Sequence, residues 1–168
     1  MIFERRSCRS FRSDPLPEDH LKALIESLRW APSAGNRQPW RFYIVTSEQK
    51  KRDLADAAFG QSFIIPAPVV FAVVAVPEES YDRYGDRGRR LFCIQDTAAA
   101  VENLMLAATA LGYGSCWIGA FDDSAVSQVL SLPSGHQPVA IIPVGRPAGY
   151  GRRTERRPSS ETVFMVDD

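Results

Sequence analysis

Arginine dominates the chemistry that this sequence could perform. The 168 residues include 17 Arg but only 3 Lys, and many of the Arg gather near the two ends. Residues 1–12 hold four Arg against Glu4, a local charge of +3, and residues 146–157 hold five Arg against Glu155, a local charge of +4. The planar guanidinium presents a fork of donors that suits phosphate. Both ends of the chain are therefore candidate phosphate-binding segments.

The N-terminal cluster contains the run Arg5-Arg-Ser-Cys-Arg9. Arg side chains form charge-assisted and often bidentate bonds to phosphate, and the Ser hydroxyl adds one more donor. Near the other end, the run from Arg152 to Arg157 would supply further donors. The alternative for both runs is a hydrated, charged tail that holds no ligand.

A second polar set lies in the run Ala31-Pro-Ser-Ala-Gly-Asn-Arg-Gln-Pro39, which its Gly and Pro residues mark as a loop. Ser33, Asn36 and Gln38 place hydroxyl and amide groups there. Because Asn and Gln both donate and accept, they suit a heteroaromatic edge that alternates C=O and N–H groups. The alternative is a turn whose polar side chains satisfy its own backbone.

Glycines recur in the run Gly112-Tyr-Gly-Ser-Cys-Trp-Ile-Gly119. Without side chains, they would let the backbone approach a flat ligand closely. The alternative is a helix cap followed by a strand.

Side chains for acid, base or metal chemistry are scarce. His20 and His136 are isolated, one predicted on a helix surface and one in a loop, and the three Cys form no CxxC pair. No zinc site and no catalytic triad is expected from such spacing. The side chains that are present would bind a cofactor that performs the reaction itself.

Composition limits the class of protein. The 20 basic and 20 acidic side chains give a net charge of zero, which disfavours nucleic acid or a membrane surface as a partner. The 45% of hydrophobic residues and the length predict one globular domain over 1–168. No apolar run reaches about 18 residues and the charged start resembles no signal peptide, so we expect a cytoplasmic protein.

Hydrophobic periodicity predicts the elements that must position these groups. The clearest is a long apolar helix over 86–111, closed by Gly112, at the centre of the fold. Eight consecutive apolar residues over 69–76 indicate a strand that is buried on both faces. The other predicted elements are helices over 18–30, 48–58 and 124–130, the last two capped by Ser47 and Asp123, and strands over 40–46, 115–118 and 138–144.

The C-terminal segment 162–166 has a β-type composition but follows the irregular stretch 145–161. It has no partner strand in a hairpin of its own, and chain termini are disordered unless something ties them down. An exposed sheet edge, in this chain or in a second subunit, would provide that partner.

Five segments in this order resemble the FMN-dependent nitroreductase family, and the resemblance covers essentially the whole chain. It implies an α+β fold with a central, mostly antiparallel sheet surrounded by helices. It also implies a homodimer with FMN at the interface, in which the C-terminal arm 146–168 of each subunit reaches the partner as a swapped strand. The segments are Arg5-Arg-Ser-x-Arg9, Ala-Pro-Ser-x-x-Asn-x-Gln-Pro-Trp at 31–40, Gln95-Asp-x-Ala-x-Ala-x-Glu-Asn103, Ala-Leu-Gly-Tyr-Gly-Ser-Cys-Trp-Ile-Gly at 110–119, and Ile-Pro-Val-Gly145 with a later Arg-Pro.

The resemblance also implies a place for each residue around FMN. Arg5 and Ser7 would lie near the phosphate, and Arg9 near the pyrimidine edge, where a cation stabilises negative charge. The loop 31–40 would come from the other subunit, and the backbone of 118–120 would supply donors near N5. The implied FMN contacts are Arg5, Arg6, Ser7, Arg9, Pro32, Ser33, Asn36, Gln38, Gln95, Ile118, Gly119, Ala120, Gly145, Arg146 and Arg156.

Two positions stay open within this resemblance. Arg156 is the best match to the family's late basic residue, but Arg153 and Arg157 lie near enough for a shift of register. Larger relatives carry a basic residue in the stretch where this chain has Phe59-Gly-Gln-Ser-Phe63, and Gln61 is the candidate replacement.

The implied activity is a ping-pong oxidoreduction in which NADH or NADPH gives hydride to FMN N5 and an oxidised acceptor, such as a nitroaromatic or quinone, then takes its place. The protein would orient and tune the cofactor, so no catalytic side chain is required. Two alternatives remain: a flavin-binding storage or regulatory protein without turnover, and a flavin-fragmenting or dehalogenating enzyme of the same fold.

Overall fold

The computed structural model describes residues 1–151 and 153–167. Its centre is a four-stranded antiparallel sheet in the order β1-β2-β4-β3. The strands are β1 (Trp40–Val45), β2 (Val69–Ala75), β3 (Gly114–Ser115) and β4 (Gln137–Gly145). The α-helices are α1 (Glu18–Arg29), α2 (Glu48–Ala57), α3 (Pro77–Arg87), α4 (Cys93–Ala110) and α5 (Asp123–Leu130).

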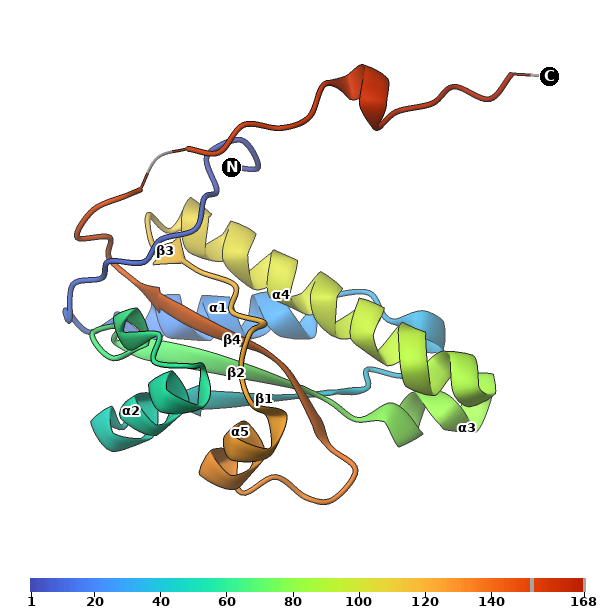
Figure 1. Ribbon diagram of the computed structural model, residues 1–168, viewed down its shortest axis with the longest axis horizontal. Coiled ribbons are helices and arrows are strands. Elements are labelled where there is room, and N and C mark those ends of the chain that lie inside the picture. Colours follow the sequence, from blue (N-terminus) through green and yellow to red (C-terminus); the bar gives the residue numbers. More distant parts are fainter. Residues whose placement is uncertain (152, 168) are drawn as a thin grey trace.

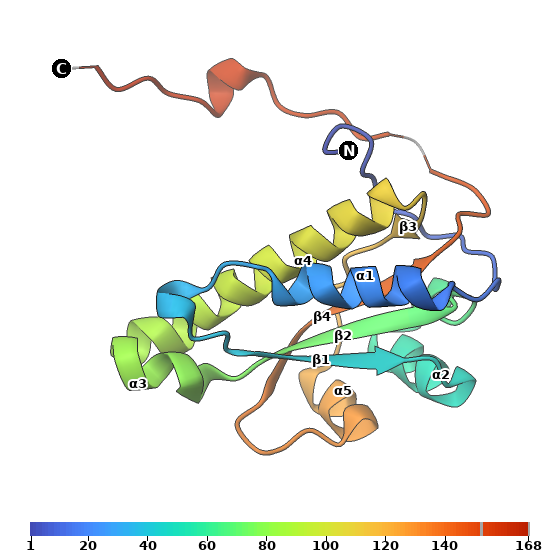
Figure 2. The same cartoon turned by 180° about the vertical axis from the view of Figure 1, so that it is seen from behind.

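Helices cover both faces of this sheet (Figures 1 and 2). α1 and α4 pack on one face, in a core that includes Phe71 and Leu104. α2 and α5 pack on the other face, in a core that includes Leu54 and Val70. Neighbouring β2 residues thus point into different cores, which is why every position of this strand is apolar and buried. The α+β class and the antiparallel sheet that the sequence predicts are confirmed.

The long helix predicted over 86–111 is divided in the structure. Helix α3 ends at Arg87, a π-helical turn covers Gly88–Phe92, and α4 continues from Cys93 to Ala110. Gly85, with φ 57° and ψ −146°, breaks the helical geometry of α3. Periodicity does not indicate α3 because its buried side offers Ser80 rather than an apolar stripe. At the other end, Gly112 closes α4 with φ 78°, as predicted.

By length and hydropathy alone, the helical stretch Pro77–Ala110 could cross a membrane. In the structure α4 buries Ala100, Val101 and Leu104 against α1 and the sheet. The apolar character of this stretch is therefore accounted for by the core that α4 helps to build.

Two boundary predictions need correction. The strand predicted over 115–118 is only Gly114–Ser115, because the chain then leaves the edge of β4 and returns for a single bridge between Ile118 and Ile141. The cap of α5 is Asp122 rather than Asp123, since the Asp122 carboxylate accepts the N–H groups of Ser124 and Ala125. Ser47 caps α2 as predicted.

No strand forms over 162–166 within the single chain, and the pairing with a second subunit that the resemblance implies stays a prediction. The segment follows a 3-10 turn, Ser159–Glu161, and pairs with no strand in the described part of the chain. It runs away from the body of the molecule (Figure 1), and Phe164 and Met165 are 77% and 82% exposed. A β-type composition forms a strand only where a sheet edge is available to pair with it.

Candidate functional site

The two arginine-rich ends, about 140 residues apart in sequence, lie side by side (Figure 1). The Cys8 N–H donates to the Ser115 carbonyl at 2.8 Å, and the Arg12 N–H donates to the Arg146 carbonyl at 2.8 Å. The Ala148 N–H donates to the Ser10 carbonyl at 2.9 Å. Backbone hydrogen bonds thus fasten the N-terminal segment to the end of β4 and to the start of the C-terminal arm.

Gly114 allows this close approach. A Cβ built at Gly114 would lie 2.6 Å from Cys8 Cβ and 2.8 Å from Cys8 Sγ. The space that the missing side chain leaves is therefore filled by the N-terminal segment, not kept for a flat ligand as the glycine pattern suggests. Gly145 is similar, since its Cβ would meet Pro68 Cδ at 2.5 Å.

A cavity of about 590 Å³, hereafter the arginine cavity, opens where the two ends meet. Five of the residues that line it are Arg and one is an acid, Glu102. Such a wall favours an anionic ligand, because its five Arg outnumber its single acid and their guanidiniums present forked hydrogen-bond donors. Its lining comprises Ile2, Phe3, Arg5, Arg6, Ser7, Arg9, Glu102, Gly151, Arg153, Thr154 and Arg156.

Contacts between the two ends hold the arginine cavity together. The Arg6 guanidinium lies 3.8 Å from the centre of the Tyr150 ring, a cation–π contact. Arg153 donates from Nη2 to the Phe3 carbonyl. Within the arm itself, Arg156 donates from Nη1 to Thr154 Oγ1 at 3.1 Å. The arm therefore brings its own Arg to the N-terminal ones.

Two members of the late Arg run lie in the wall of the arginine cavity. Arg153 and Arg156 line the arginine cavity, whereas Arg157 does not. Arg152 lies outside the described residues. Arg146 also lies outside the cavity wall, with its guanidinium 5.9 Å from the Tyr113 ring centre.

The two cysteines beside the cavity are buried and have no disulfide partner. Burial raises the pKa of both thiols, Cys8 and Cys116, and at Cys116 the nearby Arg9 and the Ser7 hydroxyl only partly oppose it. Both thiols are thus neutral at pH 7, which does not suit a nucleophile. Among the residues that the structure describes, no three His, Cys, Asp or Glu gather where they could hold a metal ion.

The segment 118–120 only partly fits its expected role as a set of backbone donors. The Ile118 N–H is used, because it donates to the Ile141 carbonyl at 3.0 Å. The N–H groups of Gly119 and Ala120 have no hydrogen-bond partner within residues 1–151 and 153–167. Gln61 lies beside them, and its Nε2 donates to the Ala120 carbonyl at 3.2 Å.

The loop 31–39 holds its shape with its own polar groups. The Gln38 N–H donates to Ser33 Oγ at 3.0 Å, and Gln38 Nε2 donates to Asn36 Oδ1 at 3.2 Å. Asn36 and Gln38 have φ values of 56° and 51°, in the left-handed region. These hydrogen bonds match the alternative of a turn whose polar side chains satisfy its own backbone. Even so, the side chains of Pro32, Asn36 and Gln38 remain exposed.

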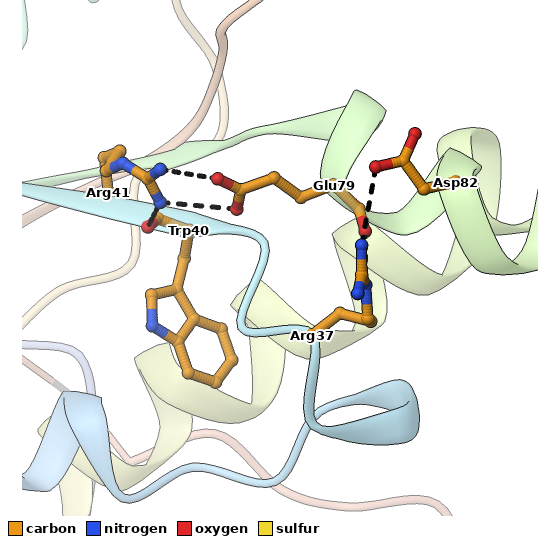
Figure 3. A network of polar contacts seen from close by, with 5 residues as sticks. All are labelled: Arg37, Trp40, Arg41, Glu79 and Asp82. Atoms are coloured by element: carbon orange, nitrogen blue, oxygen red, sulfur yellow. Dashed lines mark hydrogen bonds and ion pairs between the residues drawn. The ribbon is translucent and has the colours of Figure 1, made fainter.

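An ion-pair network ties this loop to α3 (Figure 3). Arg37 donates from Nε to the Glu79 carbonyl at 2.9 Å and from Nη2 to Asp82 Oδ2 at 3.4 Å. Arg41 of β1 pairs with the Glu79 carboxylate at 2.5 Å and also bonds the Trp40 carbonyl at 2.7 Å. Loop, strand and helix are thus joined at this end of the molecule.

Asp96 is a residue of this region that the sequence pattern does not single out. Its Oδ1 accepts the Ala34 N–H at 3.0 Å, while its buried Oδ2 has no partner in the described residues. Burial raises the pKa of this carboxyl, and the bond from Ala34 opposes the shift. Its place in the segment Gln95-Asp-x-Ala and its position as an acid in the first turn of a largely apolar helix are the signals that could have indicated it.

The predicted contacts form two groups along α4. The N-terminal segment lies beside the C-terminal half of this helix (Figures 1 and 2), and the arginine cavity that the segment lines includes Glu102 at the middle of the helix. The loop 31–39, the exposed Gln95 and Asp96 lie near its N-terminal end. Within a single chain, no residue of this loop lines the arginine cavity, and Gln95 lies seven helical residues, about 10 Å, from Glu102.

Comparison with known proteins identifies the family. The sequence model of the Nitroreductase family matches this chain over residues 2–66 and 59–146. A Thermus thermophilus protein named NADH dehydrogenase is 31% identical over 188 residues, covering 96% of this chain and 92% of that protein. This chain belongs to the nitroreductase family.

Two further relatives agree with membership in the nitroreductase family. A Bacillus subtilis protein named FMN reductase (NADPH) is 26% identical over 170 residues, covering 94% of this chain and 68% of that protein. The structure of B. megaterium NfrA1 superposes with a TM-score of 0.89 at 26% identity, covering 99% of this chain and 72% of that chain. The sheet order and helix layers described above are thus those of the nitroreductase fold.

The donor set of this nitroreductase fits a phosphorylated flavin. A phosphate needs cationic hydrogen-bond donors, and the five Arg of the arginine cavity provide them. A flavin ring requires hydrogen-bond donors on an approachable backbone. Among the described residues, the only atom near a Cβ built at Gly119 is Trp117 Nε1, at 4.0 Å. The free N–H groups of Gly119 and Ala120 meet that need.

Proposed function

We propose that this chain is an FMN-dependent oxidoreductase that takes electrons from NADH or NADPH. The observation that carries the proposal is the meeting of Arg5, Arg6, Arg9, Arg153 and Arg156 in one cavity. Two clusters of positive charge would repel each other, so bringing both together favours a site whose ligand is an anion. Membership in the nitroreductase family makes FMN phosphate the anion that fits.

The chain's own residues would hold and orient the cofactor. Arg5 and Ser7 would donate to the phosphate, and Arg9 would stabilise negative charge near the pyrimidine edge of the ring. Arg156 would add a guanidinium from the C-terminal arm. When bound, FMN supplies the redox chemistry by accepting hydride from NAD(P)H and passing it to an oxidised acceptor such as a nitroaromatic or a quinone.

No side chain is required to act as acid or base in this proposal. The neutral, buried thiols of Cys8 and Cys116 are unsuited to covalent chemistry. The protein's contribution is to orient substrate over the ring and to set the electrostatics around it. Donor and acceptor would use the same exposed ring face in turn, which gives ping-pong kinetics.

A second copy of the chain would complete each site. No residue of the loop 31–39 lines the arginine cavity of its own chain. In a two-fold dimer, the exposed Asn36 and Gln38 of one subunit could meet the ring held by the other. The exposed arm, with Phe164 and Met165, would pair with the partner's sheet and bury its apolar side chains.

Anaerobic spectroscopy of the purified protein tests this proposal. FMN should bind with a shift of the flavin absorbance, and NADH or NADPH should then bleach it, with colour returning when a quinone is added. A protein that binds no FMN would refute the flavin assignment. A flavoprotein that neither dinucleotide bleaches would instead favour storage or regulation without turnover.

The dimer requires a separate measurement. Sedimentation of the flavin-loaded protein should give twice the mass of the chain, 18.7 kDa. A stable monomer that still holds FMN would refute the shared site.

Release of a flavin fragment, instead of turnover, would favour the flavin-fragmenting alternative.

A further inference from the structure

A second cationic surface lies at the end of the molecule opposite the arginine cavity. The Tyr84 and Phe92 rings meet edge to face, with their centres 5.2 Å apart and their planes at 77°. The Arg83 guanidinium lies 5.6 Å from the centre of the Tyr84 ring, and the Arg87 guanidinium lies 5.4 Å from the centre of the Phe92 ring. These four residues are hereafter called the aromatic platform.

The two guanidiniums of the aromatic platform are available to a ligand. Arg83 and Arg87 are exposed, and no carboxylate of the described residues lies within ion-pair distance of either. Neighbouring Arg differ in this respect, since Arg37 pairs with Asp82 and Arg89 pairs with Glu78 at 2.8 Å. The network beside the platform therefore leaves two cations without an internal counter-charge.

The backbone around the platform is unusual. Phe92 ends the π-helical turn Gly88–Phe92, a rare geometry that is frequent at functional sites. A Cβ built at Gly88 would lie 2.4 Å from the Ser80 carbonyl oxygen, so only glycine fits where this turn begins. The turn aligns Phe92 with Tyr84 at the cost of regular helical bonding.

The platform also contacts the loop that is expected to reach the flavin ring. A Cβ built at Gly35 would lie 2.4 Å from the Tyr84 hydroxyl oxygen and 3.2 Å from Arg83 Nη1. Gly35 adjoins Asn36 in the turn Ala34–Asn36. A ligand on the platform would thus lie next to the residues that approach the flavin in the proposed dimer.

We infer that the aromatic platform binds the adenosine 2′,5′-bisphosphate part of NADPH, so that this enzyme prefers NADPH to NADH. This inference rests on the proposed function, which requires a dinucleotide to place its nicotinamide against the flavin. The half-buried rings of Tyr84 and Phe92 offer the part of their apolar surface that stays exposed to the adenine. The guanidiniums of Arg83 and Arg87 offer forked donors for the 2′-phosphate, the group that NADH lacks.

Calorimetric titration with nucleotide fragments tests the platform without turnover. The full chain should bind 2′,5′-ADP more tightly than 5′-AMP, because only the former carries the 2′-phosphate. The double variant Arg83→Gln, Arg87→Gln should lose about tenfold or more of its affinity for 2′,5′-ADP and keep its affinity for 5′-AMP. Arg52→Gln, an exposed Arg on α2, is the matched control and should change neither.

Steady-state kinetics provides a second readout. The double variant should raise KM for NADPH about tenfold while leaving kcat and the kinetics with NADH unchanged. Arg87→Lys, which keeps the charge but removes the fork, should give an intermediate KM for NADPH. Far-ultraviolet circular dichroism and FMN titration should match the parent chain, which verifies the fold and the flavin site.

Three results would overturn the inference. One is equal affinity of the full chain for 2′,5′-ADP and 5′-AMP, and another is unchanged 2′,5′-ADP affinity in the double variant. The third is a double variant that loses affinity for 4-nitrobenzoate but not for 2′,5′-ADP, which would assign the platform to an anionic aromatic acceptor. Absence of FMN binding, with the discrimination between 2′,5′-ADP and 5′-AMP intact, would refute the proposed function but not the platform.

Discussion

The Arg5 guanidinium Nε and a carboxylate oxygen of Glu102 lie 3.8 Å apart in the wall of the arginine cavity. Arg5 comes from the N-terminal segment and Glu102 from α4, so this ion pair fastens the segment to the central helix. A phosphate in the cavity would compete with Glu102 for the same guanidinium. The pair thus both positions Arg5 and opposes the ligand that Arg5 is proposed to bind.

Opposite effects on flavin affinity follow from this pair. Arg5→Ala should weaken FMN binding by about 1–3 kcal/mol, since a charge-assisted hydrogen bond is lost. Glu102→Gln should strengthen it by about 0.2–1 kcal/mol, the range of an exposed ion pair, because a like charge is removed from beside the phosphate. Flavin fluorescence titration measures both, with Glu26→Gln on α1 as the control, and weaker binding by Glu102→Gln would contradict the assigned phosphate position.

Asp96 should make the stability of the protein fall as pH rises. Burial raises the pKa of this carboxyl above its ordinary value of 3.8, so the folded chain holds the proton more tightly than the unfolded chain. Its contribution is therefore fully present below pH 3.8 and is lost as pH rises through the folded-state pKa. Asp96→Asn, which stays neutral and can still accept the Ala34 N–H, should gain stability relative to the parent chain between pH 4 and pH 7.

Urea unfolding at several pH values between 4 and 7 measures that gain. Asp56→Asn, an exposed carboxyl on α2, is the control and should show no such trend. Asp96→Ala should cost about 1–3 kcal/mol at pH 4, since the Ala34 N–H then loses its acceptor, and the cost should shrink as pH rises because the parent chain loses the Asp96 contribution. A pH-independent difference between Asp96→Asn and the parent chain would show that the carboxyl is not perturbed in this way.

Gly114→Ala should loosen the N-terminal segment and, with it, the arginine cavity. The new Cβ would lie 2.6 Å from Cys8 Cβ, too close for both to stay in place. We expect a loss of about 1–3 kcal/mol of stability, as for other overpacked sites, together with weaker FMN binding. Thermal unfolding and flavin titration measure these losses, and Cys8→Gly in the same chain should restore part of both. Unaltered flavin affinity in Gly114→Ala would separate the segment's packing from the cavity.

The C-terminal arm should govern assembly. Phe164 and Met165 are 77% and 82% exposed in the single chain, and burying such side chains stabilises by about 1.5–3 kcal/mol each. Phe164→Ser with Met165→Ser should therefore raise the dimer dissociation constant at least about tenfold, as measured by sedimentation equilibrium. Glu161→Gln, also exposed on the arm, is the control. A dimer of undiminished affinity in the double variant would exclude these two residues from the interface.

Local patterns predicted most of the elements because each leaves a strong periodic signal. The apolar run over 69–76 became β2, and the helix-forming patterns around Leu24, Leu54 and Val126 became α1, α2 and α5. Helix α3 was not predicted because it buries Ser80 rather than an apolar stripe. Segment 162–166 forms no strand in the described chain because β pairing needs a partner that lies beyond the segment itself, and its pairing with a second subunit stays a prediction.

The sequence by itself determined which side chains are available, many of them Arg, and an order of motifs that indicates a nitroreductase. Tertiary structure decided which of them meet. It brought Arg5 and Arg156 into one cavity, left Asn36 outside the wall of that cavity, and used the Ile118 N–H in a bridge to β4. Composition and spacing are properties of the chain, whereas the meeting of distant charges depends on how the sheet and its helices bury their apolar faces.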